Sequence, residues 1–116
     1  MVLRFTNESS RPQRGSDATV IASKSPFGPY RYVTNLNSWG EEHIKGQSSG
    51  VFTISEKAVK EERFVWATDL WFSGESGMKG DDYQYWEELE FVENKEGIPV
   101  PRRVGVVGVD GRNFEL

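Results

Sequence analysis

The sequence contains no cysteine and a single histidine, His43, among its 116 residues. Without cysteine the chain can form no disulfide, no cysteine-ligated zinc site and no thiol nucleophile. One histidine cannot supply a multi-histidine metal site either. We therefore expect neither a metal nor another cofactor, and a fold that is stabilised by packing.

Long apolar stretches are also missing. Only 36% of the residues are hydrophobic, and no run approaches the roughly 18 apolar residues of a membrane-spanning helix. Residues 1–7 lack the apolar core of a signal peptide. These absences predict one globular domain over residues 1–116, without a transmembrane segment or signal peptide, in the cytoplasm or a host cytosol.

Positive charge is in deficit, with 14 Lys and Arg against 18 Asp and Glu and a pI near 5.0. This balance disfavours nucleic acid as a partner, because binding to phosphates needs a basic surface. The charge is uneven, since residues 61–100 hold three Lys or Arg and eleven Asp or Glu. Such a segment either forms a solvated acidic face or contacts a basic partner.

Aromatic residues are abundant, with four Trp, four Tyr and seven Phe. Many of them lie with β-branched residues in short runs that are separated by Gly and Pro, a pattern typical of strands. The predicted strands span residues 2–6, 18–23, 30–36, 50–55, 64–72 and 103–109. The pattern predicts a mainly β fold, an antiparallel β-sandwich or small barrel of about six to eight strands, and it allows one short helix.

Two segments are ambiguous. Residues 55–63 begin with a potential N-cap, Ser55, and form either a short helix or a charged connection. Residues 83–93 fit both a strand, with alternate aromatic residues on one face, and a helix with an apolar stripe. The aromatic content of 83–93 favours the strand.

The densest aromatic segment, residues 66–86, is the candidate binding surface. In a strand Trp66 and Trp71 face opposite sides, so both cannot belong to one core. Aromatic rings beside Asp and Gln can stack on sugars or sit at a lipid headgroup surface. Our first hypothesis is a non-catalytic recognition module that binds a glycan or lipid headgroup. Its predicted ligand-binding residues are Trp66, Asp69, Trp71, Tyr83, Tyr85 and Trp86.

The acidic segment suggests a second hypothesis, an inhibitor or adaptor that engages a basic partner protein. The residues predicted to contact that partner are Glu75, Asp81, Asp82, Glu87, Glu88 and Glu90.

A third hypothesis is a small hydrolase. His43, Asp69 and Ser76 occur in the order of the triad of chymotrypsin-like serine proteases. That family builds its site between two β-barrels, for which 116 residues are too few. The carboxylates of residues 69–90 are a second route to hydrolysis, as a paired general acid and base. We favour a non-catalytic protein and assign no catalytic residue, and the oligomeric state stays open.

Overall fold

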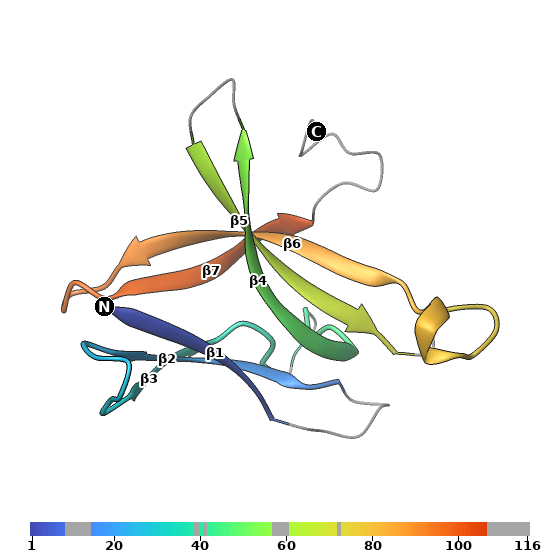
Figure 1. Ribbon diagram of the computed structural model, residues 1–116, viewed down its shortest axis with the longest axis horizontal. Helices are drawn as coiled ribbons and strands as arrows, with labels where there is room; N and C mark the ends of the chain where they lie inside the picture. The colour runs from blue at the N-terminus through green and yellow to red at the C-terminus, as the bar shows by residue number, and fades with distance from the viewer. Residues whose placement is uncertain (9–14, 39, 41, 57–60, 72, 107–116) are drawn as a thin grey trace.

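The computed structural model describes residues 1–8, 15–38, 40, 42–56, 61–71 and 73–106. These residues form seven β-strands in two antiparallel sheets that face each other, as Figure 1 shows. The prediction of a mainly β, sandwich-like fold is therefore confirmed.

The smaller sheet contains β1 (Val2–Glu8), β2 (Asp17–Ser23) and β3 (Arg31–Asn35) in that order. Its central strand, β2, shows the alternation of a strand with one buried face, because Ala18, Val20 and Ala22 are all buried. On β1, Leu3 lies opposite Ala22 and Phe5 opposite Val20, which extends the same apolar face.

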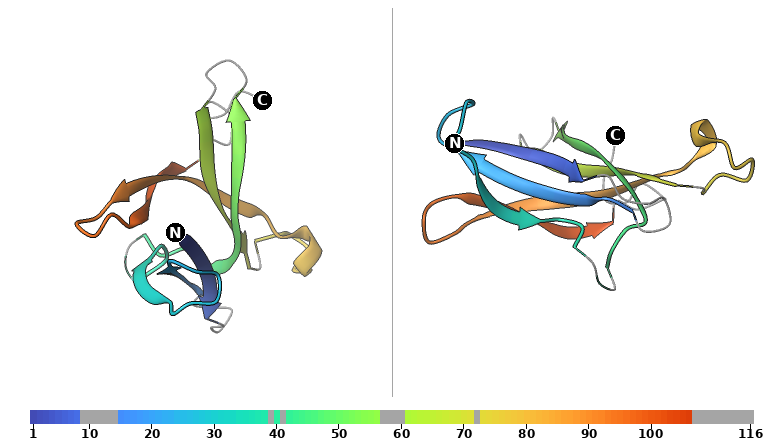
Figure 2. Two further views of the ribbon diagram at one scale, coloured as in Figure 1. Left: turned by 60° about the vertical axis from the view of Figure 1, so that its left-hand side comes forward. Right: turned by 90° about the horizontal axis from the view of Figure 1, so that it is seen from below.

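The larger sheet contains β4 (Gly46–Glu56), β5 (Glu61–Leu70), β6 (Gln84–Glu93) and β7 (Pro99–Val106), again in chain order. The far ends of β4 and β5 extend away from the smaller sheet, which Figure 2 shows clearly. Four consecutive residues of β5, Val65 to Thr68, are buried, so this central strand is covered on both of its faces.

The core lies between the sheets. Its buried residues are Ala18, Val20, Leu36, Trp66 and Leu89. Hydrogen bonds join the sheets at one edge, where Asn7 Nδ2 donates to the carbonyl of Ser48 (2.5 Å) and Ser16 N donates to that of Gly46 (2.7 Å). Only glycine fits at position 46, because a Cβ there would lie 2.1 Å from the carbonyl oxygen of Asp69 on the paired strand β5.

Both ambiguous segments are extended where the structure describes them. Residues 84–93 form β6, which confirms the strand interpretation. The helix considered for residues 55–63 is wrong at both ends, because Ser55 pairs with Glu62 and Glu56 with Glu61 in the β4–β5 ladder. Cross-strand pairing has overridden local helix propensity here. Residues 57–60, Phe72 and 107–109, which belong to predicted segments, lie outside the described residues.

The described part of the chain has one helical segment, the short 3₁₀ helix η1 (Lys79–Asp81) between β5 and β6. It lies outside both segments, 55–63 and 83–93, for which a helix was considered. Within the same residues, no helix is long and apolar enough to cross a membrane.

Candidate functional site

Strand alternation divides the predicted ligand-binding residues between two faces of the larger sheet. Trp66 and Tyr85 point inward, where their rings form an edge-to-face pair with centroids 6.3 Å apart. Trp66 is 0% exposed, and its Nε1 donates to Ser48 Oγ at 2.8 Å. The assignment of Trp66 to a ligand surface is therefore wrong, because its indole forms the centre of the core.

A second aromatic cluster lies on the outer face of the same sheet. We call Phe52, Asp69, Gln84 and Trp86 the outer-face cluster. Trp86 is 39% exposed and packs edge-to-face on Phe52, with ring centroids 5.1 Å apart. The indole reaches from β6 across β5 to β4, and its direct partner on β5 is the small residue Ala67. Because Ala67 has only a methyl group, the indole can lie across β5.

A chain of hydrogen bonds fixes the polar side of the outer-face cluster. Trp86 Nε1 donates to Gln84 Oε1 at 3.0 Å, and Gln84 Nε2 donates to Asp69 Oδ1 at 3.2 Å. Asp69 and Gln84 are direct cross-strand partners, which brings the carboxylate beside the amide. The structure thus brings together two of the predicted residues, Asp69 and Trp86, and adds two that were not predicted.

The two added residues differ in how they could have been found. Gln84 lies two positions before Trp86, so strand alternation alone places both on one face. Phe52 comes from β4, and only the register that pairs it with Val65 brings it near Trp86. No local sequence signal reports that register.

Trp71 and Tyr83 flank the loop that joins β5 to β6. Trp71 is half-buried just after β5, and Tyr83 is exposed just before β6. Backbone hydrogen bonding continues between these ends, since Leu70 N donates to the carbonyl of Tyr83 at 2.9 Å. Both residues therefore lie near the end of the sheet that carries Asp69, next to the outer-face cluster.

The loop itself is closed by its own polar groups. Asp82 Oδ1 accepts hydrogen bonds from Ser73 N (3.1 Å) and Gly74 N (3.4 Å), and Ser73 Oγ accepts one from Tyr83 N (2.7 Å). Ser76 Oγ donates to the Asp81 carboxylate. Asp81 and Asp82, predicted to contact a basic partner, thus also shape this loop.

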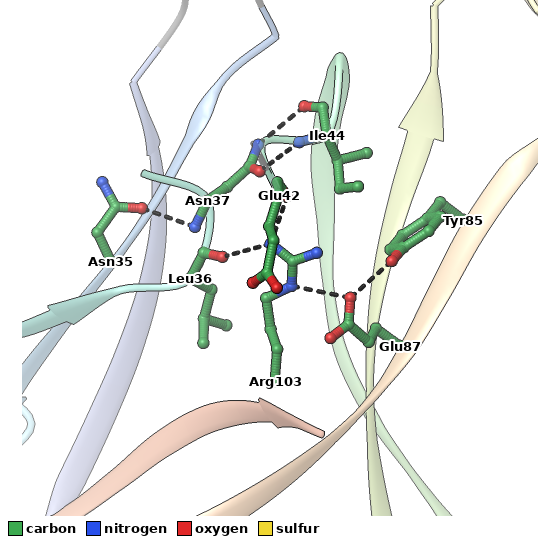
Figure 3. A network of polar contacts seen from close by, with 8 residues as sticks. All are labelled: Asn35, Leu36, Asn37, Glu42, Ile44, Tyr85, Glu87 and Arg103. Carbon is green, nitrogen blue, oxygen red and sulfur yellow. Dashed lines mark hydrogen bonds and ion pairs between the residues drawn. The ribbon is translucent and has the colours of Figure 1, made fainter. Parts of the chain in front are cut away.

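A buried ion pair joins the neighbouring strands β6 and β7 on the inner side of the larger sheet (Figure 3). Arg103 Nε donates to Glu87 Oε1 at 2.8 Å, and these side chains are only 14% and 6% exposed. Arg103 Nη1 also donates to the carbonyls of Leu36 (3.4 Å) and Glu42 (2.7 Å). The guanidinium carbon lies 5.4 Å above the centroid of the Trp66 ring. Arg103 therefore fastens β7 to the loop between β3 and β4.

That loop is held in place by Asn37, which is buried completely. Its Nδ2 donates to the carbonyls of Ser16 (2.8 Å) and Ile44 (3.0 Å), and its Oδ1 accepts from Ile44 N (2.7 Å). Asn35 Oδ1 accepts from Asn37 N at 2.9 Å, as Figure 3 also shows. These bonds position the carbonyl groups that Arg103 contacts.

Burial and hydrogen bonding shift the pKa values of two members of this network, Tyr85 and Arg103. Tyr85 OH donates to Glu87 Oε1 at 2.6 Å, and burial together with the Glu87 carboxylate raises the pKa of Tyr85, against the opposing effect of Arg103. Burial alone would lower the pKa of Arg103, but hydrogen bonding to Glu87 and Tyr85 raises it overall. The tyrosine thus stays protonated and the arginine charged.

Two pockets adjoin Arg103. One has a volume of about 390 Å³ and is lined by residues that include Thr34, Ser38 and Arg102. The other, of about 350 Å³, is lined by residues that include Ile44 and Tyr85. Three of the N–H groups of Arg103 are directed at protein acceptors, so its charge is compensated internally. We therefore place the candidate ligand site on the outer-face cluster instead.

Arginines from neighbouring strands neutralise much of the acidic segment. Arg63 binds Glu88 through two hydrogen bonds of 2.9 and 2.6 Å, and Arg102 pairs with Glu90. Glu87 is buried against Arg103, so its assignment to a partner surface is wrong. Glu75 is exposed in the loop between β5 and β6. The predicted acidic surface is thus divided among ion pairs, loop contacts and the exposed Glu75.

The three residues of the considered protease triad are bonded in different parts of the structure. His43 Nδ1 lies 2.9 Å from the carbonyl oxygen of Asn37, and Asp69 belongs to the outer-face cluster. Ser76 Oγ, the would-be nucleophile, donates to Asp81. Within the described residues, no group of three or more His, Asp or Glu side chains is arranged to hold a metal ion.

Comparisons of the chain with protein-family models, with curated proteins and with solved structures find no significant match.

Proposed function

We propose that the protein is a non-catalytic carbohydrate-binding module and that the outer-face cluster is its binding site. One observation carries this proposal: an exposed indole, Trp86, is held in a fixed orientation beside the polar side chains of Gln84 and Asp69. Sugar recognition needs an aromatic ring for the apolar C–H face of a pyranose and hydrogen-bonding groups for its hydroxyls.

The cluster is already organised for such a ligand. The edge-to-face contact with Phe52 and the hydrogen bond to Gln84 restrict rotation of the Trp86 side chain. Less conformational entropy is then lost when a sugar binds, which favours affinity. The Gln84 amide has two N–H groups and an exposed side chain, so it can bond both Asp69 and a sugar hydroxyl.

The surroundings of the cluster favour a glycan over a lipid headgroup. Asp69 places a carboxylate within the cluster. This carboxylate disfavours the approach of an anionic membrane. It is compatible with a neutral sugar, because a sugar hydroxyl group can donate a hydrogen bond to a carboxylate.

Ion pairing weakens the alternative of a basic protein partner. Glu88 and Glu90 already contact Arg63 and Arg102, and Glu87 is buried. A partner would have to displace these arginines before it gained an electrostatic contact. The outer-face cluster requires no such exchange.

A glycan array followed by titration calorimetry tests the proposal. Wild-type protein should bind at least one class of neutral oligosaccharide, and Trp86→Ala should reduce the affinity about tenfold or more, as expected for an aromatic hot spot. Tyr32→Ala is the matched control, because Tyr32 is an exposed aromatic residue on the smaller sheet. It should leave the affinity unchanged.

Circular dichroism of each variant checks that the fold is retained. Gln84→Ala provides a second test that leaves the indole in place and should also weaken binding. The proposal is refuted if folded Trp86→Ala binds as tightly as wild type, or if the wild type binds no oligosaccharide on the array.

A further inference from the structure

One end of the molecule, away from the outer-face cluster, presents an unusual aromatic residue. The start of β1, the β2–β3 connection and the β6–β7 turn meet there, on the left of Figure 1 and again on the left of the right-hand view in Figure 2. We call residues 1–4, 24–31 and 94–98 the basic end. Phe27, at the tip of the β2–β3 connection, is 98% exposed. A single exposed apolar ring is common in proteins, so its meaning depends on the groups that lie near it.

The exposure of Phe27 is imposed by the local structure. Ser25 O accepts a hydrogen bond from Gly28 N at 3.0 Å, and Ser25 Oγ accepts one from Phe27 N at 3.3 Å. Tyr30 OH donates to the carbonyl of Pro26 at 2.7 Å, across the same turn. Gly28 has a φ of 87°, a conformation that favours glycine. The ring is thus presented on a closed turn.

Basic residues outnumber acidic ones at the basic end. Lys24 and Arg31 flank the β2–β3 connection, Arg4 lies with its guanidinium carbon 5.4 Å from the centroid of the Tyr30 ring, and Lys95 is exposed in the β6–β7 turn. Glu96 offsets part of this charge through an ion pair with Arg31. Positive residues therefore predominate here, although the whole chain has a net charge of −4.

A pocket of about 360 Å³ lies beside the turn. Apolar residues, among them Ala22, Pro29 and Ile98, form part of its lining, and Lys24 and Arg31 supply cationic groups. This combination suits a ligand that carries both an anionic group and an apolar part.

We propose that the basic end docks on an anionic phospholipid bilayer, with the Phe27 ring inserted at the level of the headgroups. Phe27 is a single ring that stands out at the tip of a turn, whereas a protein hot spot is normally enclosed by further contacts. A bilayer interface can close around one ring, and cations beside it attract anionic headgroups. The protein's other surfaces, which carry the excess of acidic residues, would point away from the membrane.

Vesicle co-sedimentation at low salt tests this inference. Wild-type protein should bind vesicles of phosphatidylcholine with phosphatidylserine and should not bind phosphatidylcholine alone. Phe27→Ala should weaken binding about tenfold through lost apolar contact. Lys24→Ala and Lys95→Ala should each weaken it about fivefold, and added salt should weaken it further.

Two variants serve as matched controls. Tyr32→Ala removes an exposed aromatic ring outside the turn, and Lys45→Ala removes an exposed cation from the β3–β4 connection. Both should bind vesicles like the wild type. The inference is overturned if wild-type protein fails to bind the anionic vesicles, or if Phe27→Ala binds them as well as wild type. An acidic protein would then be the better candidate for this surface. Because Trp86 lies outside the basic end, failure here leaves the glycan proposal intact.

Discussion

Replacing Arg103 with methionine should destabilise the protein far more than the same change at its neighbour Arg102. Methionine keeps an apolar side chain over Trp66 but removes the ion pair with Glu87 and the hydrogen bonds to the carbonyls of Leu36 and Glu42. Glu87 would remain buried without its counter-charge, which is the costly consequence.

The magnitude follows from burial. Side-chain exposures of 14% for Arg103 and 6% for Glu87 make this a buried pair, whose rupture by loss of one partner costs about 3–5 kcal/mol. A domain with a free energy of unfolding of roughly 5–15 kcal/mol would lose a large share of its stability. Arg102 and Glu90 are 67% and 42% exposed, so Arg102→Met should cost only about 0–1 kcal/mol.

Urea denaturation of both single variants measures this difference from the transition midpoints and slopes. The double variant Arg103→Met with Glu87→Leu should recover part of the loss, since no charge is then left buried and unpaired. Equal losses of stability in Arg103→Met and Arg102→Met would contradict this role of the buried pair, as would a double variant that is no more stable than Arg103→Met alone.

Three further changes probe other contacts. Because the pKa of Tyr85 is raised in the folded protein, the unfolded chain loses this proton first as the pH rises above about 10, so stability should fall there. Tyr85→Phe should flatten that fall in urea denaturation at a series of alkaline pH values, and an unchanged slope would contradict the assignment. Asn37→Ala should lower the free energy of unfolding by about 2–3 kcal/mol, at roughly 1 kcal/mol for each of the three hydrogen bonds that its side chain makes. A melting temperature equal to that of the wild type would refute this. Gly46→Ala should prevent stable folding, because its Cβ would collide with the Asp69 carbonyl. Gly105→Ala should be tolerated, because no atom lies within 4 Å of the added Cβ. Expression level and circular dichroism spectra of the two variants measure this difference.

The strands were predictable because their signal is local. Aromatic and β-branched residues recur with a period of two, and glycine or proline marks several of the connections. For the same reason the aromatic pattern identified β6 correctly against a helical alternative. At residues 56 and 61–63 the structure shows neither the short helix nor the charged connection, because helix-favouring charged residues pair there in a hairpin that depends on β4 meeting β5.

The candidate site was only partly predictable. Alternation showed that Trp66 and Trp71 could not share one core, but it could not decide which of them is buried. That choice depends on the smaller sheet, since Ala18, Val20 and Leu36 enclose Trp66 together with Leu89. Phe52 was missed altogether, because it is far from Trp86 in sequence and meets it only through the register of two strand pairs.

The sequence by itself determined a cysteine-free, aromatic-rich β protein with an acidic segment, because composition and periodicity are properties of the chain alone. Tertiary structure decided which charges are neutralised and which rings are available. Arg63, Arg102 and Arg103 reach the glutamates of β6 only after the strands pair, and two sheets must meet before one tryptophan is buried and another is left at the surface. Burial and ion pairing depend on distances between residues remote in sequence, which the order of the residues alone does not specify.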